Sequence, residues 1–295
     1  MNFSEKLKSL RKQTGMSQEQ LAEKLGVSRQ AVTKWETDTG IPDIENMMAI
    51  STLFGVSLDE LLSDRVSGKR DDFLFESVTE YDIAEPKHYD MKFGGAKRLV
   101  LSGYSGEKLK IRLASQTLPR LQSDFKIKID DIKGRIDVDC IANGITEASA
   151  KEALFVFVWL PAPYVRKIEC AAHAEEVELR GIACDEIELD VKSPRVILDG
   201  VAGEAEITCN LDMEIDCKTL EGAVELYQIS AASRITVPAD ARFEARKKGI
   251  GNRIFFERSG TTCDPFDEKG AEHLITLKGF NSELLICARE EKSAP

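Results

Sequence analysis

The 295-residue sequence predicts two domains of different class, an all-α N-terminal domain of five helices and an all-β C-terminal domain. Helical spacing of apolar residues and helix-capping residues fill about the first 63 positions, whereas apolar and polar residues alternate with period two through most of the chain after position 97. The length also suits two domains. We therefore expect a helical domain over 1–63, a linker over 64–97 and a β-rich domain over 98–295.

The clearest helical signal lies in the segment 17–37. Ser17 is a good N-cap and Gln20 follows three residues later, so both side chains can satisfy free N–H groups at the start of a helix. Gly26 supplies the left-handed residue that ends this helix, and Ser28 caps the next one. The segment therefore predicts two helices that cross at a tight turn.

The second of these helices has two distinct faces. Val32 and Trp35 lie three residues apart on an inward face, where Trp35 is expected in the core. The outward side chains are Arg29, Gln30, Thr33 and Lys34. Arginine can form paired hydrogen bonds with guanine and glutamine with adenine, each worth ~1–3 kcal/mol of discrimination. This face is suited to a DNA major groove.

The segment resembles the phage-repressor helix-turn-helix family, also called xenobiotic-response-element-like. The resemblance is carried by Leu21, Ala22, Leu25, Gly26, Val27, Val32 and Trp35. It extends to about residues 1–63 through three further features: an amphipathic first helix with Phe3, Leu7 and Leu10, a fourth helix opened by Ile41, Pro42 and Asp43, and an ending over 55–62 with Ser57 and Glu60 as a second capping box. The resemblance implies a sequence-specific DNA-binding regulator.

The resemblance also implies residue roles. The base-facing residues would be Gln18, Arg29, Gln30, Thr33 and Lys34. Those that meet phosphates or brace the surface would be Arg11, Ser17, Ser28, Glu36 and Thr37. In the resembling repressors an arginine at the end of the first helix pairs with a glutamate after the recognition helix, so Arg11 and Glu36 are expected to hold the shape of this surface.

The charge distribution agrees with a DNA-binding N-terminus. The whole chain carries a net charge of −11, but residues 1–35 carry seven basic and three acidic residues, a net charge of +4. An acidic body suppresses non-specific adhesion to DNA, so affinity has to come from a correctly placed basic domain.

The C-terminal domain reads as repeated short strands. The segment 177–181 recurs as 196–200, a spacing of 19 residues, and a second short strand follows each copy. This rhythm predicts a β-solenoid, in which stacked coils bury a continuous core. A β-sandwich, or a solenoid beside a flat sheet, is the alternative. The apolar segment 153–160 predicts a strand covered on both faces.

The region 159–246 is also similar to a bacterial adhesin-like β-solenoid family. The similarity rests on strand rhythm, recurring glycines and the strand ends Leu160-Pro161 and Val237-Pro238. It implies the fold of this domain. An adhesive function does not follow, because a fold hosts many functions and the N-terminus has no signal-peptide pattern.

The sequence predicts no metal, no cofactor and no enzymatic activity. Cys140, Cys170, Cys209 and Cys217 are in phase with inward apolar residues and are expected to be small core residues, whereas Cys184 and Cys263 are expected in turns. The three histidines, His88, His173 and His273, have no nucleophile motif beside them, and no phosphate-binding loop follows a strand.

These observations predict a cytoplasmic transcriptional regulator, with repression favoured over activation. The longest apolar run, 153–162, is far below the ~20 residues of a membrane helix, so no membrane insertion is expected. The expected partner is double-stranded DNA with a palindromic operator. The β-domain is expected to join copies of the chain in a homodimer or larger assembly, to sense a small-molecule or protein effector, or to do both. The alternative is a cytosolic interaction scaffold or envelope-stress partner in which the β-domain carries the activity.

Overall fold

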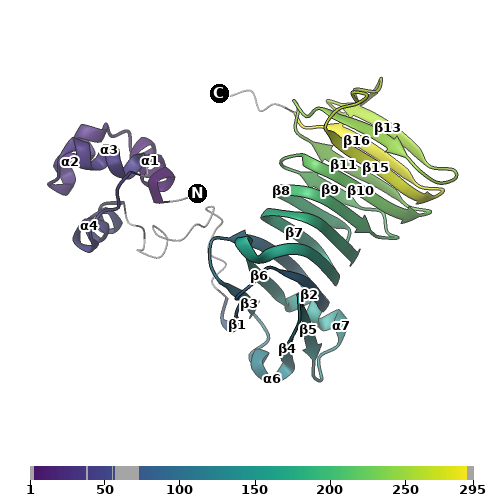
Figure 1. Ribbon diagram of the computed structural model, residues 1–295, viewed down its shortest axis with the longest axis horizontal. Helices are drawn as coiled ribbons and strands as arrows, with labels where there is room; N and C mark the ends of the chain where they lie inside the picture. Colours follow the sequence, from purple (N-terminus) through teal and green to yellow (C-terminus); the bar gives the residue numbers. More distant parts are fainter. Residues whose placement is uncertain (1–2, 38, 55, 57–72, 291–295) are drawn as a thin grey trace. The chain divides into compact units, whose positions relative to one another are not determined.

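The computed structural model describes residues 3–37, 39–54, 56 and 73–290. The chain divides into two compact units, Met1–Asp72 and Phe73–Pro295, which are described one at a time. Helices form the first unit, drawn in purple in Figure 1, and strands dominate the second, drawn from blue to yellow. The predicted all-α plus all-β class is confirmed.

The described helices of the first unit are α1 (Phe3–Gln13), α2 (Gln18–Leu25), α3 (Arg29–Glu36) and α4 (Ile44–Phe54). They enclose a small apolar core made of Leu7, Leu21, Ala22, Val32, Trp35 and Ile50. The core position predicted for Trp35 is confirmed. The expected fifth helix, with its Ser57 and Glu60 capping box, lies outside the described residues.

The predicted capping interactions of α2 and α3 are present. Ser17 Oγ accepts a hydrogen bond from Gln20 N at 3.1 Å, and Gln20 Oε1 accepts one from Ser17 N at 2.8 Å. Gly26 ends α2 in the left-handed region with φ of 68°. Ser28 Oγ accepts from Ala31 N at 3.2 Å and starts α3. The tight turn between the two helices is therefore fixed by local hydrogen bonds at both sides.

Sixteen strands and three short helical segments make up the described second unit. The strands are β1 (Phe75–Asp82), β2 (Lys87–Tyr104), β3 (Lys108–Ser115), β4 (Phe125–Ile132), β5 (Arg135–Ala142), β6 (Phe155–Pro161), β7 (Val165–Lys192), β8 (Arg195–Thr208), β9 (Glu214–Cys217), β10 (Glu221–Ile229), β11 (Ala232–Val237), β12 (Phe243–Lys247), β13 (Arg253–Arg258), β14 (Thr261–Cys263), β15 (His273–Phe280) and β16 (Glu283–Ala288). The helical segments are α6 (Leu121–Asp124), α7 (Glu147–Ala153) and η1 (Ala162–Tyr164).

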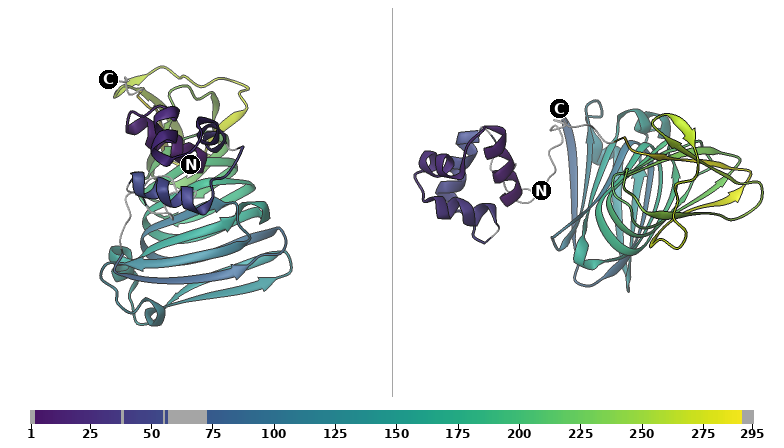
Figure 2. Two further views of the ribbon diagram at one scale, coloured as in Figure 1. Left: turned by 90° about the vertical axis from the view of Figure 1, so that its left-hand side faces the viewer. Right: turned by 90° about the horizontal axis from the view of Figure 1, so that it is seen from above.

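Parallel pairing of successive coils builds a β-solenoid (Figure 2). One face has the strand order β4-β5-β2-β7-β8-β10-β15-β12, and the other has β1-β3-β6-β2-β7-β8-β9-β11-β16-β13-β14. The long strands β2, β7 and β8 run through both faces. Val177 pairs with Val196, so the 19-residue repeat seen in the sequence is the register between neighbouring coils.

The coils do not stack in the order of the sequence at the C-terminal end. Strand β15 lies between β10 and β12, and β16 lies between β11 and β13. The last coil of the chain is therefore inserted between the two coils that precede it in sequence.

A continuous apolar core runs between the two faces, and both ends of the stack are covered. Near the start, Leu121 of α6 is buried in this core. At the other end Phe266, in the segment after β14, packs edge-on against Phe243 and Phe256 with ring centroids 5.8 and 5.0 Å apart. Closed ends keep water from the core of a solenoid, as terminal caps do in repeat proteins.

The predicted linker 64–97 is wrong from residue 75 onward, where the chain forms strands. Residues 64–72 lie outside the described part of the chain, but the rest forms β1 and the first half of β2. The outward face of β1 carries Glu76 and Glu80, whose ion pairs with Arg112 and Lys110 of β3 satisfy charges that read as a polar linker in the sequence. The boundary at residue 63 stays a prediction.

The strand expected over 153–160 forms as β6, and only one of its faces is fully buried. Val156, Val158 and Leu160 point into the core, whereas Phe155 and Phe157 are half-buried on the outer face. The ring of Phe73 covers them, with centroids 4.7 and 5.9 Å away.

Candidate nucleic-acid interface

Helix α3 presents a polar face in the first unit. Arg29, Gln30 and Lys34 are exposed, while Thr33 is half-buried. Thr33 Oγ1 donates to the backbone oxygen of Arg29 at 3.0 Å and lies 3.3 Å from Gln18 Oε1. The three exposed side chains are free of the core contacts that hold the other face of α3, so they can reach a molecule lying along the helix.

An ion pair braces α1 against the end of α3. Arg11 Nε and Nη2 donate to the two carboxylate oxygens of Glu36 at 2.6 and 2.9 Å. The side chains are 11% and 1% exposed, respectively. Arg11 Nη1 also donates to the backbone oxygen of Met16 at 2.8 Å. A fork-to-fork pair of this kind fixes orientation as well as distance.

The pair shifts the acidity of both groups. Burial alone would raise the pKa of the Glu36 carboxyl, but hydrogen bonds from Arg11 and Gln18 and the charges of Arg11 and Lys8 hold it below its ordinary value. The hydrogen bond to Glu36 likewise raises the pKa of Arg11. Both groups therefore stay charged near neutral pH.

Gln18 connects this ion pair to α3. Its Nε2 donates to Glu36 Oε2 at 2.9 Å, and its Oε1 faces the Thr33 hydroxyl. Arg11, Glu36, Gln18 and Thr33 thus form one chain of hydrogen bonds across α1, α2 and α3. Sequence reasoning assigned Gln18 and Thr33 only as base-facing residues and missed this link, since no local spacing connects positions 15 residues apart.

The remaining predicted residues lie at helix ends. Ser17 and Ser28 are exposed N-caps of two eight-residue helices, where backbone N–H groups and the helix dipole favour an anion. Thr37 is the exposed C-cap of α3, and its Oγ1 donates to the backbone oxygen of Thr33 at 2.8 Å. The structure therefore brings polar helix starts, exposed cations and a braced α3 into one small unit.

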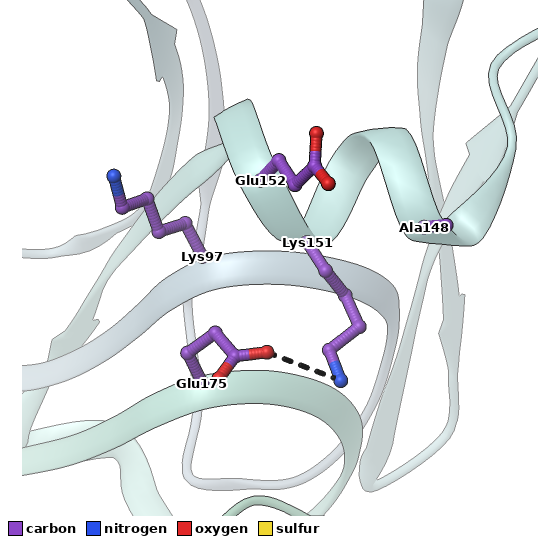
Figure 3. A pocket seen from close by; sticks show the side chains of 5 residues that line it. All are labelled: Lys97, Ala148, Lys151, Glu152 and Glu175. Atoms are coloured by element: carbon purple, nitrogen blue, oxygen red, sulfur yellow. Dashed lines mark ion pairs between the residues drawn. The ribbon is translucent and has the colours of Figure 1, made fainter.

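An open concavity of about 430 Å³ lies beside α7 in the second unit (Figure 3). Its lining residues are Lys97, Ala148, Lys151, Glu152 and Glu175. Lys151 Nζ lies 3.3 Å from a carboxylate oxygen of Glu175, and the Lys97 ammonium lies 5.7 Å from the Phe155 ring centroid. Two lysines against two glutamates leave no net charge, so the lining favours no particular class of ligand.

The cysteines are distributed through the β-unit. Cys170, Cys209 and Cys217 are buried and Cys140 is half-buried against the core. Burial raises the pKa of the Cys140, Cys170 and Cys217 thiols to about 12. Within the described residues no three His, Cys, Asp or Glu side chains are grouped to hold a metal ion.

Two cysteines differ from the sequence prediction. Cys184, expected in a turn, lies within β7, and Cys263 ends β14; both are half-buried. Burial raises the pKa of Cys184 to about 11. Strand β7 continues through position 184, although its register with β8 shifts between Ala183 and Glu186. Among the helices that the structure describes, none has the length and apolar character needed to cross a membrane.

Comparison with known proteins supports the assignment of the first unit. A sequence profile described as helix-turn-helix matches residues 7–61. The HTH-type transcriptional activator BcrR of Enterococcus faecalis is 52% identical over 63 residues, which cover 21% of this chain and 31% of that protein. The present chain thus spans about a third of the length of BcrR.

Two regulators of Bacillus subtilis match over more of their length. The uncharacterized HTH-type regulator YqaE is 34% identical over 87 residues, and the HTH-type regulator ImmR is 33% identical over 91 residues. Each match covers 30% of this chain and 72% of the relative.

Solved structures resemble the β-unit at low sequence identity. A candidate cell adhesion protein of Clostridium sporogenes has 12% identity and a TM-score of 0.37, over 73% of this chain and 99% of that one. A candidate adhesin of Bacteroides fragilis has 10% identity and a TM-score of 0.33, over 73% and 98%. The solenoid assignment rests on the strand register of the present chain.

Proposed function

We propose that this chain, which belongs to the helix-turn-helix family of transcriptional regulators, reads a specific DNA site with α3 and regulates transcription through paired DNA-binding units. The observation that carries the proposal is the exposed polar face of α3, braced from behind by the buried ion pair of Arg11 and Glu36. A preset helix loses little conformational entropy on binding, so its contacts can contribute to specificity.

Within this proposal, Arg29, Gln30 and Lys34 approach base edges from the exposed side of α3. Gln18 and Thr33 reach the same groove while they hold each other in position. Ser17 and Ser28 offer helix N-termini to phosphate oxygens, and Thr37 adds a hydroxyl at the far end of α3. Phosphate contacts set the register on the duplex and base contacts set the sequence.

The β-unit is proposed to join two chains on a palindromic operator, and an effector bound to it would act by changing the spacing of the two DNA-binding units. One small DNA-binding unit buries little DNA surface, and such units bind half-sites about one DNA turn apart. A shared body makes the second contact intramolecular, which raises avidity by ~10²–10⁴. The regulator is proposed to act in the cytoplasm without a catalytic step.

Repression is favoured over activation within the proposal. RstR of a cryptic Vibrio cholerae phage is named a transcriptional repressor and is 27% identical over 93 residues. BcrR carries the name of an activator, so both directions occur among the relatives.

The test combines operator selection with binding assays. Full-length protein is used to capture genomic fragments, and the enriched site is then synthesised as one and two half-sites. We expect gel shifts to show at least 100-fold tighter binding to the paired half-sites, and light scattering to show a dimer or larger assembly. Absence of any enriched fragment would contradict DNA recognition and favour a scaffold role.

A further inference from the structure

Four successive coils of the solenoid each place one exposed apolar side chain at the same corner. In spatial order these are Leu211, Ile229, Phe280 and Ile250, with 46%, 45%, 46% and 72% of their surface exposed. Ile229 pairs in register with Phe280, and Phe280 forms a bridge with Ile250. Asn210, next to Leu211, accepts a hydrogen bond from Ile229 N at 3.0 Å. We call this row the corner ridge.

Buried side-chain hydrogen bonds hold the backbone beneath the corner ridge. Beneath it, buried Gln228 donates from Nε2 to the backbone oxygen of Leu211 at 3.0 Å and to Ser233 Oγ at 2.8 Å. Buried Asn252 donates from Nδ2 to the backbone oxygens of Lys248 and Gly279 at 2.7 and 3.2 Å. Internal bonds at consecutive corners hold the backbone that presents the ridge. A preformed surface loses little entropy when it is covered.

Charge changes sign along the ridge. The coil 203–222, which carries Leu211, has six carboxylates and one lysine, a net charge of −5. The next two coils, 223–240 and 273–290, have net charges of −1 and 0. The coil 241–258, which carries Ile250, has six basic and two acidic residues, a net charge of +4. The segment 259–272 that follows has a net charge of −3, but it returns to the other end of β12, where Glu268 N donates to the Phe243 backbone oxygen, so Lys247 and Lys248 are the charges beside Ile250. The ridge therefore runs from an acidic end to a basic end.

We infer that the corner ridge is the interface with a second copy of this chain, packed antiparallel about a two-fold axis. In that arrangement Leu211 of one copy faces Ile250 of the other, and Ile229 faces Phe280. The acidic coil of each copy then lies against the basic coil of its partner, whereas a parallel arrangement would place like charges together. The apolar row forms the centre and the charged coils form the rim, which is the usual anatomy of a protein interface.

This inference rests on the proposed function in one respect: the surface that it names is the one that would pair the two DNA-binding units. The charge gradient favours a second copy of this chain as the partner, because a ridge that is acidic at one end and basic at the other complements its own reversed copy. A ridge spanning four coils is about 14 Å long at the usual strand spacing, so the flanking charged residues supply the remaining contact area.

The test measures the dimer dissociation constant of the full chain by sedimentation. The ridge variant Ile229→Lys/Phe280→Lys should raise it by ~100-fold or more, because both changes place charges at the centre of the interface. The matched control is Val78→Lys/Ile132→Lys, which changes two exposed apolar residues on β1 and β4, with 58% and 54% of their surface exposed. The control should dimerise like the wild type, and both variants should keep the wild-type melting temperature.

A charge reversal tests the antiparallel order. Lys247→Glu/Lys248→Glu should weaken the dimer at least tenfold, and addition of Glu214→Lys on the acidic coil should recover most of that loss. A monomeric wild type, a ridge variant that dimerises normally, or no recovery in the triple variant would overturn the inference. Binding to a single half-site should be equal in all variants, so failure of DNA recognition is read separately from failure of the ridge.

Discussion

Glu36 receives two hydrogen bonds from the guanidinium of Arg11, 25 residues earlier in the chain, at 2.6 and 2.9 Å. The contact links the end of α1 to the end of α3, and the Glu36 carboxylate is almost fully buried. Since Gln18 also donates to Glu36, the position of α3 depends on a charged group that has little access to water.

Arg11→Ala should destabilise the helical unit by about 3 kcal/mol, because it leaves the Glu36 carboxylate buried without its partner. Urea denaturation followed by Trp35 fluorescence, in a Trp159→Phe background, reports on this unit alone because the chain has two tryptophans. The exposed Lys24 on α2 gives the control, and Lys24→Ala should change the unfolding free energy by less than about 0.5 kcal/mol. Equal effects of the two variants would contradict the bracing role.

The stability of the helical unit should fall on the acid side. The pKa of Glu36 is lower in the folded state than its ordinary value of 4.5, so its stabilising contribution is complete above pH 4.5. That contribution is lost as the pH falls through the lowered folded-state value. The Glu36→Gln variant should have a lower unfolding free energy than the wild type at pH 7. Its unfolding free energy should also change less with pH between pH 5 and about 2. If the unfolding free energy of this variant fell with acid pH as steeply as that of the wild type, other carboxyl groups would be responsible for the fall.

Arg29→Ala/Gln30→Ala should weaken binding to the selected operator by ~10²-fold while the melting temperature stays unchanged, because both side chains are exposed and each base contact is worth ~1–3 kcal/mol. Lys12→Ala changes an exposed cation on α1 and serves as the comparison. The Lys12→Ala substitution should weaken binding to specific and to non-specific DNA equally. Operator affinity that survives the double substitution would rule out α3 as the base-reading element.

Thiol labelling should separate the cysteines by burial. Cys170 and Cys217 are buried with their pKa values raised to about 12, so they should react slowly with a thiol reagent at pH 8. Half-buried Cys263 should react first. Mass spectrometry of partially labelled protein gives the order, and rapid reaction of Cys170 would show that the core opens on the labelling timescale.

Gly279→Ala should destabilise the β-unit by about 3 kcal/mol or more. Its φ is 103°, and an added Cβ would overlap the backbone oxygen of Gln228 on the neighbouring coil. Gly270→Ala is the control, because Gly270 has a φ of 80° but no atom within 4 Å of the added Cβ. It should cost only about 1–2 kcal/mol. Thermal unfolding of the two variants gives the difference that is due to the close approach of the coils.

Local signals predicted the helical unit well. The Ser17 and Gln20 capping box, the left-handed Gly26 and the inward Trp35 all depend on residues within a few positions of one another, and each appears in the structure as expected. The 19-residue repeat also predicted the pairing of Val177 with Val196, because the coil length sets the register.

Long-range pairing accounts for what the sequence did not predict. β1 reads as a charged linker until β3 supplies the opposite charges for Glu76 and Glu80. The bond between Gln18 and Glu36 requires two helices to meet first. The proposed DNA contacts depend on α3 residues whose exposure the structure describes, and their roles at bases and phosphates remain predictions.

The insertion of β15 and β16 between earlier coils has a consequence for biosynthesis. When the nascent chain has emerged as far as Arg258, β10 and β12 are both present but the strand that separates them has not been made. The two would have to stay about two strand spacings apart, or pair wrongly and then separate, until residues 273–288 arrive. The solenoid can therefore be completed only after residues 273–288 have been made, and a premature stop near residue 272 would leave a hole inside the stack and not a shortened end.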